Sequence, residues 1–284
     1  MNKGEYLRVM SFNVLLDWRK EGPYTWANRR NSVASMIRFH HVDVAGLQEP
    51  LRNQVDDLSN LLPEYAWLGI GREDGKTRGE YAAIFYRKGR LEVLESGSFW
   101  LSETPDVPGS LGWDAACVRI TTWARFKDKC TGNEFFLFNT HFDHVGITAQ
   151  AESACLLLKQ IKDIAGDFPV IVTGDFNCVE NSEAYRIMTG AASGSQKDET
   201  DHMVDAFYAS LHGNHGAVVS FHGFDEEIQK AKEENGCDFE RIKIDYIFVK
   251  NGIKVLQHGI LDEKFNGRYP SDHSPVVSDI VIDR

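Results

Sequence analysis

An aspartate and an asparagine stand two residues apart at the end of an apolar run, in the segment Val170-Ile-Val-Thr-Gly-Asp-Phe-Asn177. In an extended chain residues i and i+2 point to the same side, so Asp175 and Asn177 project together beyond the run. Gly174 lets the backbone turn there or lets a ligand approach closely. Two interpretations fit this segment alone equally well: an Asx turn that closes a strand, and a polar pair that binds a ligand.

Acidic, amide and imidazole side chains also end or interrupt other apolar runs. They are Asn13, Glu49 after Val44-Ala-Gly-Leu-Gln, His141 and Asp143 after Phe138-Asn-Thr, Asp245 within Ile242–Val249, and Asp272 with His273 before the last apolar run. A buried carboxylate costs free energy unless it is paired or binds a metal, so separate turns explain this set poorly. The set therefore predicts one site built from distant segments.

Short strand-like runs carry these polar residues. Val118–Phe126 alternates apolar with polar residues, as a strand with one solvent-exposed face does, whereas Val170–Val172 is continuously apolar, as in a strand covered on both faces. The predicted strands are Leu7–Leu16, Val42–Leu47, Tyr81–Tyr86, Leu91–Leu101, Ala116–Phe126, Glu134–Thr140, Val170–Thr173, Ile242–Val249 and Val276–Val281.

Three segments have apolar residues at helical spacing. These residues are Trp26, Val33, Met36 and Ile37 in the first, Val55, Leu58 and Leu61 in the second, and Ala151, Ala154, Cys155, Leu158, Ile161 and Ala165 in the third. We expect the stripes to face the core and Thr148 to cap the third helix. Many strands with few helices predict an α/β fold of two packed sheets with helices outside.

The whole chain, residues 1–284, is predicted to form one domain, because it has no internal repeat and no low-complexity linker. Two polar stretches interrupt the pattern. Gly190–Thr200 is predicted to be a mobile surface loop, and the charged stretch Asp225–Asp238 is predicted to be a solvated face or loop.

Composition argues against several classes of protein. A net charge of −11 disfavours a broad basic surface for duplex nucleic acid, because Lys and Arg supply most of that affinity. No apolar run approaches the ~20 residues of a membrane span. No signal peptide is visible, so a cytoplasmic location is the default expectation, with export if a leader was removed beforehand. The five cysteines are scattered and odd in number, and we expect free, mostly buried thiols.

The order of the polar motifs resembles that of the endonuclease/exonuclease/phosphatase superfamily. The motifs are Asn13, Gln48-Glu49, Asn139-Thr-His141, Gly174-Asp-Phe-Asn177, Ile244-Asp-Tyr246 and Ser271-Asp-His273. Phe99–Pro105 and Gly112–Ala116 look most like an uncharacterised bacterial and fungal branch, with some likeness to nocturnin-type deadenylases. The resemblance implies a four-layer α/β sandwich, in which two packed mixed β-sheets are flanked by helices and the site lies at one end.

A divalent cation is part of what the resemblance implies: Mg²⁺, for which Mn²⁺ can substitute. Glu49 is the expected metal ligand, and Asn13 is expected to hold Glu49 or a metal-bound water. The alternative for Glu49 is a helix N-cap or a salt-bridge partner before the helix that starts near Arg52. Asp272 is a second candidate for the metal or for a water.

The expected catalytic residues surround a phosphate. Asp175 is expected to act as the base or to orient the attacking water, and Asn177 to donate a hydrogen bond to a phosphoryl oxygen. His141 and His273 are expected to flank the phosphate as donors, which are strongest when protonated. The resemblance implies that Asp245 holds the far nitrogen of His273.

The substrate side is expected to include Glu80, Arg78 and Tyr81, and Arg72 stands in the same segment. Glu80 aligns with the glutamate that supports the other histidine in deoxyribonuclease-like members. Arg72, Arg78 and Tyr81 stand where family members carry substrate-side residues.

Other residues keep two interpretations open. Asp143 and His144 are either rim residues of the site or surface and strand-capping residues. Trp100 and Trp113 either stack on a base or sugar or lie in the core, which is the commoner role. The remaining seven histidines have no motif context, and we expect them to be ordinary surface or core residues.

The leading hypothesis is a metal-dependent phosphoester hydrolase, above all a phosphodiesterase or nuclease that acts on single-stranded nucleic acid or on a small phosphodiester. A single-strand nuclease needs aromatic platforms and a local basic channel. The alternatives are a phosphomonoesterase, a lipid or sugar phosphodiesterase on the same fold, and a binding module that has lost catalysis. No protein partner is evident from the sequence.

Overall fold

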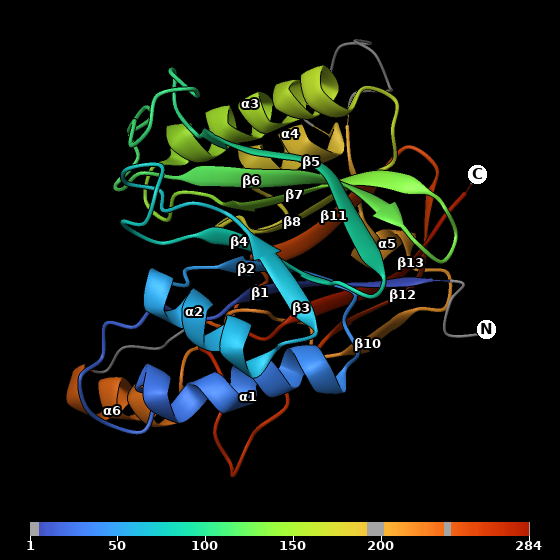
Figure 1. The fold of residues 1–284 in the computed structure, drawn as a ribbon. Helices are drawn as coiled ribbons and strands as arrows, with labels where there is room; N and C mark the ends of the chain where they lie inside the picture. The colour runs from blue at the N-terminus through green and yellow to red at the C-terminus, as the bar shows by residue number, and fades with distance from the viewer. Residues whose placement is uncertain (1–5, 192–201, 236–239, 284) are drawn as a thin grey trace.

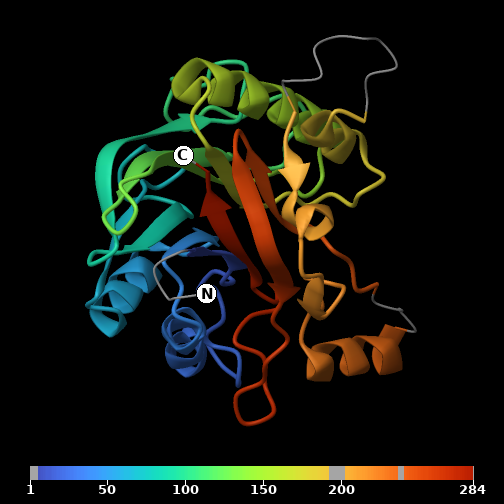
Figure 2. The ribbon, with the colours of Figure 1, turned by 90° about the vertical axis from the view of Figure 1, so that its right-hand side faces the viewer.

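Two β-sheets pack face to face in the computed structural model, and helices cover their outer faces (Figure 1). The structure describes residues 6–191, 202–235 and 240–283. Helices α1 and α2 lie against one sheet, and α3 and α4 lie against the other (Figures 1 and 2). The four layers confirm the predicted α/β sandwich.

The seven-stranded sheet has the order β10-β12-β13-β1-β2-β4-β3. It is mixed, because β1 runs parallel to β2 and antiparallel to β13. Its strands are β1 (Leu7–Asn13), β2 (Val44–Gln48), β3 (Tyr65–Leu68), β4 (Ala82–Arg87), β10 (Asn214–Gly216), β12 (Ile253–Ile260) and β13 (Val276–Ile282).

The six-stranded sheet has the order β5-β6-β7-β8-β11-β9. It is also mixed, because β8 runs parallel to β7 and antiparallel to β11. Its strands are β5 (Leu91–Trp100), β6 (Ile120–Asp128), β7 (Glu134–His141), β8 (Val170–Asp175), β9 (Val204–Asp205) and β11 (Asp245–Lys250).

The helices are α1 (Trp26–Phe39), α2 (Arg52–Leu61), α3 (Ile147–Ala165), α4 (Glu183–Thr189), α5 (Ala206–Ala209) and α6 (Asp225–Asn235). The predicted cap of α3 is wrong: Gly146 is the N-cap residue, and Thr148 lies inside the first turn. The buried stripe of α3 is also rotated from the prediction, since Cys155 is exposed and Leu157 is buried. Asp225–Asn235 forms a helix with an exposed charged face rather than a loop. Residues 192–200 of the predicted mobile loop and residues 236–238 lie outside the described residues.

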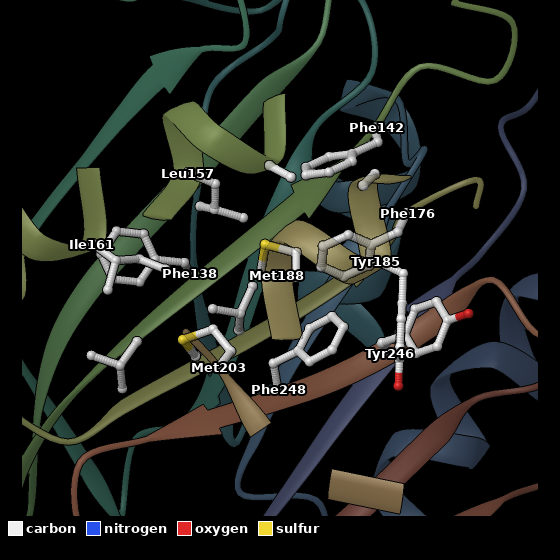
Figure 3. Close-up of a cluster of buried hydrophobic side chains, with 14 of the residues drawn as sticks. Phe138, Phe142, Leu157, Ile161, Phe176, Tyr185, Met188, Met203, Tyr246 and Phe248 are labelled. Carbon is white, nitrogen blue, oxygen red and sulfur yellow. The ribbon is translucent and has the colours of Figure 1, made fainter. Parts of the chain in front are cut away.

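An apolar core joins the six-stranded sheet to α3 and α4 (Figure 3). Phe138 of β7, Phe248 of β11 and Leu157 of α3 meet there with Phe176, which follows β8 directly. The rings of Phe176 and Phe248 lie edge to face at 5.1 Å. Burying Phe176 in this way holds the chain between Asp175 and Asn177 against the sheet.

The strand faces that look into the space between the sheets change from apolar to polar towards one end of each strand. On β1, Val9 lies in the core between the sheets, and Asn13 follows on the same face four residues later. The same change runs through Leu137, Asn139 and His141 on β7, Ile171, Thr173 and Asp175 on β8, and Val249, Ile247 and Asp245 on β11. The strand register aligns these changes, so the polar ends meet at one end of the sandwich.

A buried hydrogen-bond network joins the two sheets beneath this polar end. The Nε2 of Gln48 donates to Oδ1 of Asn139 at 2.6 Å, and Oγ1 of Thr173 donates to the same oxygen at 3.1 Å. Gly46 makes room for the network, because a Cβ there would lie 2.0 Å from Oγ1 of Thr173 and 2.4 Å from Oδ1 of Asn139.

The prediction that the cysteine thiols are mostly buried is wrong for the described cysteines. Four cysteines are described and all are free, but only Cys178 is buried; Cys117 is half-buried, and Cys130 and Cys155 are exposed. Cys237 lies outside the described residues. Among the described helices, none has the length and apolar character needed to cross a membrane.

Candidate active site

Asp175 lies at the centre of the polar end, where β8 is flanked by β7 and β11. Its Oδ2 accepts a hydrogen bond from Nδ2 of Asn13 at 2.9 Å, and its Oδ1 accepts one from the backbone N–H of Asn177 at 2.9 Å. The same Oδ2 lies 3.4 Å from Nε2 of His141 and 3.8 Å from Nε2 of His273. Burial, together with Asp245, raises the pKa of Asp175 to about 6, which leaves it ionised at neutral pH.

Glu49 and Asn13 lie beside Asp175. The Oε1 of Glu49 accepts from Nδ2 of Asn13 at 2.9 Å, and its Oε2 accepts from the backbone N–H of Leu16 at 3.0 Å. Asn13 therefore orients two carboxylates with one amide group. Glu49 is not the N-cap of α2, because Leu51 occupies that position. The φ of Glu49 is +72°, a left-handed conformation that the packing must stabilise in a residue with a long side chain.

The donor set around Glu49 fits a hard divalent cation. Glu49, Asp175 and His141 each place one ligand atom within 4.8 Å of the others. Burial and the nearby Asp272 raise the pKa of Glu49, as expected where carboxylates gather without a cation. Carboxylate oxygens are the ligands that Mg²⁺ and Mn²⁺ prefer, so the residues present fit the expected ion.

His273 is held by Asp245 on one side of Asp175. Its Nδ1 lies 2.8 Å from Oδ2 of Asp245, and both side chains are buried. Burial alone would lower the pKa of His273, but Asp245 and Asp175 outweigh it and raise the pKa to about 10. His273 is therefore a cation at neutral pH, with its Nε2 turned towards Asp175.

His141 lies on the other side of Asp175 in a different environment. Asn177 donates its Nδ2 to the carbonyl of Phe142 at 3.1 Å and approaches Nε2 of His141 at 3.0 Å. Because the Phe142 contact orients the amide, Nε2 of His141 accepts and the ring proton lies on Nδ1. Burial and the positive charges of Arg119 and Arg72 lower the pKa of His141 well below its ordinary value, so this ring is neutral.

Glu80 approaches His141 but is bound by arginine. Its Oε2 accepts from Nη1 of Arg72 at 2.6 Å, whereas Nδ1 of His141 and Nη1 of Arg119 each lie 3.9 Å away. Burial raises the pKa of Glu80 to about 7, and Arg72 opposes that rise. Trp100 is buried and donates its Nε1 to the carbonyl of Arg72 at 2.6 Å, so it has a core role.

Two of the expected substrate-side residues lie away from this group. Tyr81 is 2% exposed, belongs to the core beneath α1 and α2, and donates its hydroxyl to the carbonyl of Lys76 at 3.2 Å. The side chain of Arg78 is 73% exposed and pairs with Glu73 at 3.2 Å. The structure therefore contradicts the expectation that Tyr81 contacts substrate, and it places Arg78 on the surface.

Asp143 lies next to the site but organises loops. Its carboxylate accepts four backbone N–H groups, including those of Gly146 at 2.7 Å and Ala116 at 3.1 Å. Burial acts to raise the pKa of Asp143, but these donors outweigh it and hold the pKa at about 2. His144 is exposed, and its Nδ1 accepts a hydrogen bond from Nη2 of Arg119 at 3.1 Å. Asp143 thus has the capping role, and His144 lies at the rim.

Sequence reasoning missed Arg119. Its side chain is 5% exposed, and its Nε, which has no hydrogen-bond partner, lies 3.7 Å from Oδ1 of Asp143. The alternation in Val118–Phe126 suggested solvent-facing polar residues. Arg119 instead precedes β6 and turns inwards beside Glu80, which no local pattern signals.

The family model for the Endonuclease/Exonuclease/phosphatase family matches residues 10–273. The chain belongs to this family. The resemblance inferred from the polar motifs is therefore confirmed. Endonucleases, exonucleases and phosphatases all hydrolyse phosphoesters, which confirms the prediction of a phosphoester hydrolase.

Solved structures in the Endonuclease/Exonuclease/phosphatase family align with nearly the whole chain. A family member from Bacteroides vulgatus is 40% identical with a TM-score of 0.85, over 98% of this chain and 99% of that chain. The mannosyl-6-phosphatase of Bacteroides thetaiotaomicron is 34% identical with a TM-score of 0.84, over 97% and 100%. The human nocturnin catalytic domain, with bound sulfate, is 21% identical with a TM-score of 0.70, over 98% and 94%, and shows the fold alone.

Two curated relatives are much longer than this chain. The chain spans 51% of the CCR4-Not 3'-5'-exoribonuclease subunit of Mycosarcoma maydis, at 22% identity, and 31% of Drosophila melanogaster nocturnin, at 24% identity. These matches confirm the likeness to the nocturnin side.

Proposed function

We propose that this chain hydrolyses phosphoesters with a water oriented by Asp175, on a phosphate that His273 binds on one side and that lies against Asn177 and His141 on the other. The observation that carries the proposal is the position of Asp175 Oδ2, 3.4 Å from Nε2 of one histidine and 3.8 Å from Nε2 of the other. A group that must accept a proton beside a phosphate needs hydrogen-bond reach and a pKa near the working pH. Asp175 has both.

The attacking water binds to Asp175. The carboxylate cannot rotate, because Asn13 and the backbone of Asn177 each hold one of its oxygens. As the water oxygen bonds to phosphorus, its proton passes to Asp175, and the ester oxygen leaves with the bonding electron pair and takes a proton from solvent. A carboxylate fixed in this way supplies orientation as well as basicity.

His273 and Asn177 contact the phosphoryl oxygens. His273 donates from Nε2 as a cation, and Asp245 maintains that charge from the opposite nitrogen. The two N–H groups of the Asn177 amide contact Phe142 and His141, so Asn177 would donate to a phosphoryl oxygen in exchange for its contact with His141. As a neutral donor it adds no repulsion towards an anion. Fixed donors around the developing charge stabilise the transition state, and they act more strongly where the side chains are buried, as here. Glu49 and Asp272 would hold Mg²⁺ or Mn²⁺, which when bound neutralises charge on the phosphoryl oxygens.

The leading substrate class is a phosphodiester, including single-stranded nucleic acid. A phosphomonoester is the second candidate. It is favoured by the 34% identity, over nearly the whole of both chains, to a protein described as a mannosyl-6-phosphatase. The net charge of −11 also repels long polyanions more than it repels a single phosphate.

A paired assay tests the function. The purified chain is given bis(p-nitrophenyl) phosphate and p-nitrophenyl phosphate, with Mg²⁺, with Mn²⁺ or with EDTA. We expect metal-dependent release of p-nitrophenol that EDTA abolishes, and the ratio of kcat/KM for the two esters separates diesterase from monoesterase. A folded chain that binds the metal yet hydrolyses neither ester, nor any phosphoester in a broad panel, would favour a binding module.

A further inference from the structure

Trp18 presents an exposed aromatic ring on the loop whose backbone binds Glu49. It lies on the loop between β1 and α1, and 56% of it is exposed. The backbone N–H of Leu16 donates to Oε2 of Glu49 at 3.0 Å, and the N–H of Trp18 donates to the carbonyl of Leu16 at 3.1 Å. This tight turn keeps the Cα of Trp18 within about 7 Å of the Cα of Leu16. The indole therefore starts beside the residue that holds Glu49.

The indole is supported on one face. The guanidinium of Arg19 lies 4.7 Å from the Trp18 ring centre and 5.3 Å from that of Phe224. Phe224 is buried and stacks on Tyr24 at 3.7 Å. Both Nη atoms of Arg19 pair with the carboxylate of Glu227 in α6. These contacts make a layered group of Trp18, Arg19, Phe224 and Tyr24, which we call the Trp18 stack.

A second backbone connection ties the Trp18 stack to the site. The N–H of Gly223, the residue before Phe224, donates to the carbonyl of Asp272 at 3.1 Å. The Trp18 stack thus adjoins Glu49 through Leu16 and Asp272 through Gly223. Glu49 accepts through its carboxylate and Asp272 through its backbone carbonyl, each from a residue next to the Trp18 stack, so the stack borders the segments that carry both residues.

We propose that Trp18 binds the ring of the organic group esterified to the scissile phosphate. This inference rests on the proposed function and names its substrate class: a small phosphate ester that carries a sugar ring or a base next to the phosphate. Arg19 covers one face of the indole, which leaves the rest of the exposed ring for a ligand. Aromatic platforms bind rings by stacking, and Trp18 stands two residues after Leu16, whose N–H binds Glu49, so the platform belongs to the loop that borders the proposed phosphate site.

The acidic surface favours a monomeric ester over a long strand. Arg19 is already paired with Glu227, so no unpaired cation of the Trp18 stack remains to bind a second phosphate. The chain carries a net charge of −11, and each further phosphate of a strand adds repulsion. A neutral ring adds none, and stacking depends little on ionic strength.

The test compares Trp18→Ala and Trp18→Phe with the unmodified chain on three phosphate esters. Mannose 6-phosphate carries a sugar ring, thymidine 5'-monophosphate p-nitrophenyl ester carries a base, and glycerol 3-phosphate carries no ring. We expect Trp18→Ala to raise KM about tenfold for a ring-bearing ester, with kcat within about twofold, because a lost stacking contact weakens binding without touching the reacting atoms. Trp18→Phe should restore most of the loss.

Each outcome bears on one claim. An increase in KM for the sugar ester alone, or for the base ester alone, identifies the ring and supports the proposal. Equal losses on all three esters, or an unchanged KM for both ring esters, overturn it. Phe39→Ala, at an exposed ring at the end of α1, is the matched control and should change nothing. If the unmodified chain hydrolyses no phosphoester at all, the proposed function fails instead.

Discussion

His273 and His141 lie on opposite sides of Asp175, yet they hold opposite charge states. His273 is 2.8 Å from the carboxylate of Asp245, which pairs with no arginine among the described residues, and the pKa of His273 is raised to about 10. His141 faces Glu80 at 3.9 Å, and its pKa is lowered. Both rings are buried, so burial does not distinguish them.

The difference comes from the partner of each histidine. The carboxylate of Asp245 contacts His273, whereas the carboxylate of Glu80 accepts a hydrogen bond from Arg72 at 2.6 Å. The cations beside His141 repel a further proton, and the carboxylates beside His273 attract one. A phosphate between the two rings therefore meets a cation on one side and a neutral ring with an amide on the other. Three substitutions test this asymmetry, and a fourth tests the hydrogen-bond network beneath the site.

The largest expected effect follows Asp175→Asn, which removes the group that both histidines share. Asparagine keeps the shape and loses the base, so we expect kcat to fall about 1,000-fold. Steady-state kinetics with saturating metal measure this, and circular dichroism checks the fold. Asp163→Asn, on the exposed face of α3, is the matched control. A variant at position 175 with unchanged turnover would remove Asp175 from the mechanism.

Asp245→Asn tests the environment of the cationic histidine, His273. In the unmodified chain His273 is protonated below a pKa of about 10 and loses its charge as the pH rises through that value. Without Asp245, burial has less opposition and the pKa falls. We expect the alkaline limb of kcat/KM to move to lower pH, with a loss of about 100-fold at pH 8.

The pH profile of kcat/KM from pH 5 to pH 10 decides the outcome for Asp245→Asn. An alkaline limb at the same pH in both proteins would show that Asp245 does not maintain the charge of His273. Lowered activity at every pH with an unmoved limb would indicate a structural role only.

Glu80→Gln tests the environment of the neutral histidine, His141, and should lower activity less than Asp245→Asn does. Glu80 is held by Arg72 and lies 3.9 Å from His141, so its removal changes the position of Arg72 more than the charge of the ring. We expect kcat/KM to fall about tenfold, with no movement of the alkaline limb. Glu73→Gln, in the exposed pair with Arg78, serves as the control. A loss as large as that of Asp245→Asn would contradict the asymmetry.

Gly46→Ala should leave the charge states of His141 and His273 unchanged and lower the stability of the fold. The added Cβ would meet Thr173 and Asn139 beneath the site, and both side chains are buried. Overpacking of this kind costs about 1–3 kcal/mol of unfolding free energy. Urea unfolding measures the loss, and Gly89→Ala, which meets nothing within 4 Å, is the control. Equal stability of the two variants would show that the network relaxes freely.

Much of the site followed from single segments. Apolar runs marked the strands, and the polar residue that ended each run proved to lie at the same end of the sandwich, as with Asp175 and His141. The prediction that Tyr81 contacts substrate failed, because it depended on the side to which the side chain points. Glu80 and Tyr81 are neighbours in the chain, and neighbours in an extended segment point to opposite sides. When Glu80 faces the site, Tyr81 must face the core beneath α1 and α2.

Residues outside the strand ends were harder to place. Arg119 carries no motif, and its burial beside Glu80 depends on how two sheets meet. Trp18 likewise drew no attention, because exposure and a nearby carboxylate are not visible in a single segment. Thr148 was misplaced by two residues, since Gly146 ends the preceding loop and begins α3 in its place.

The amino-acid sequence by itself determined which chemical groups the chain carries, their order, and the strands that end in them, because apolar periodicity is local. Only the tertiary structure decided the charge state of each group. Asp245 and His273 are 28 residues apart in the chain, and their contact makes one imidazole a cation. Arg119 and Arg72 approach His141 from other segments and keep the second imidazole neutral. Charge depends on distance in space, which no local pattern contains.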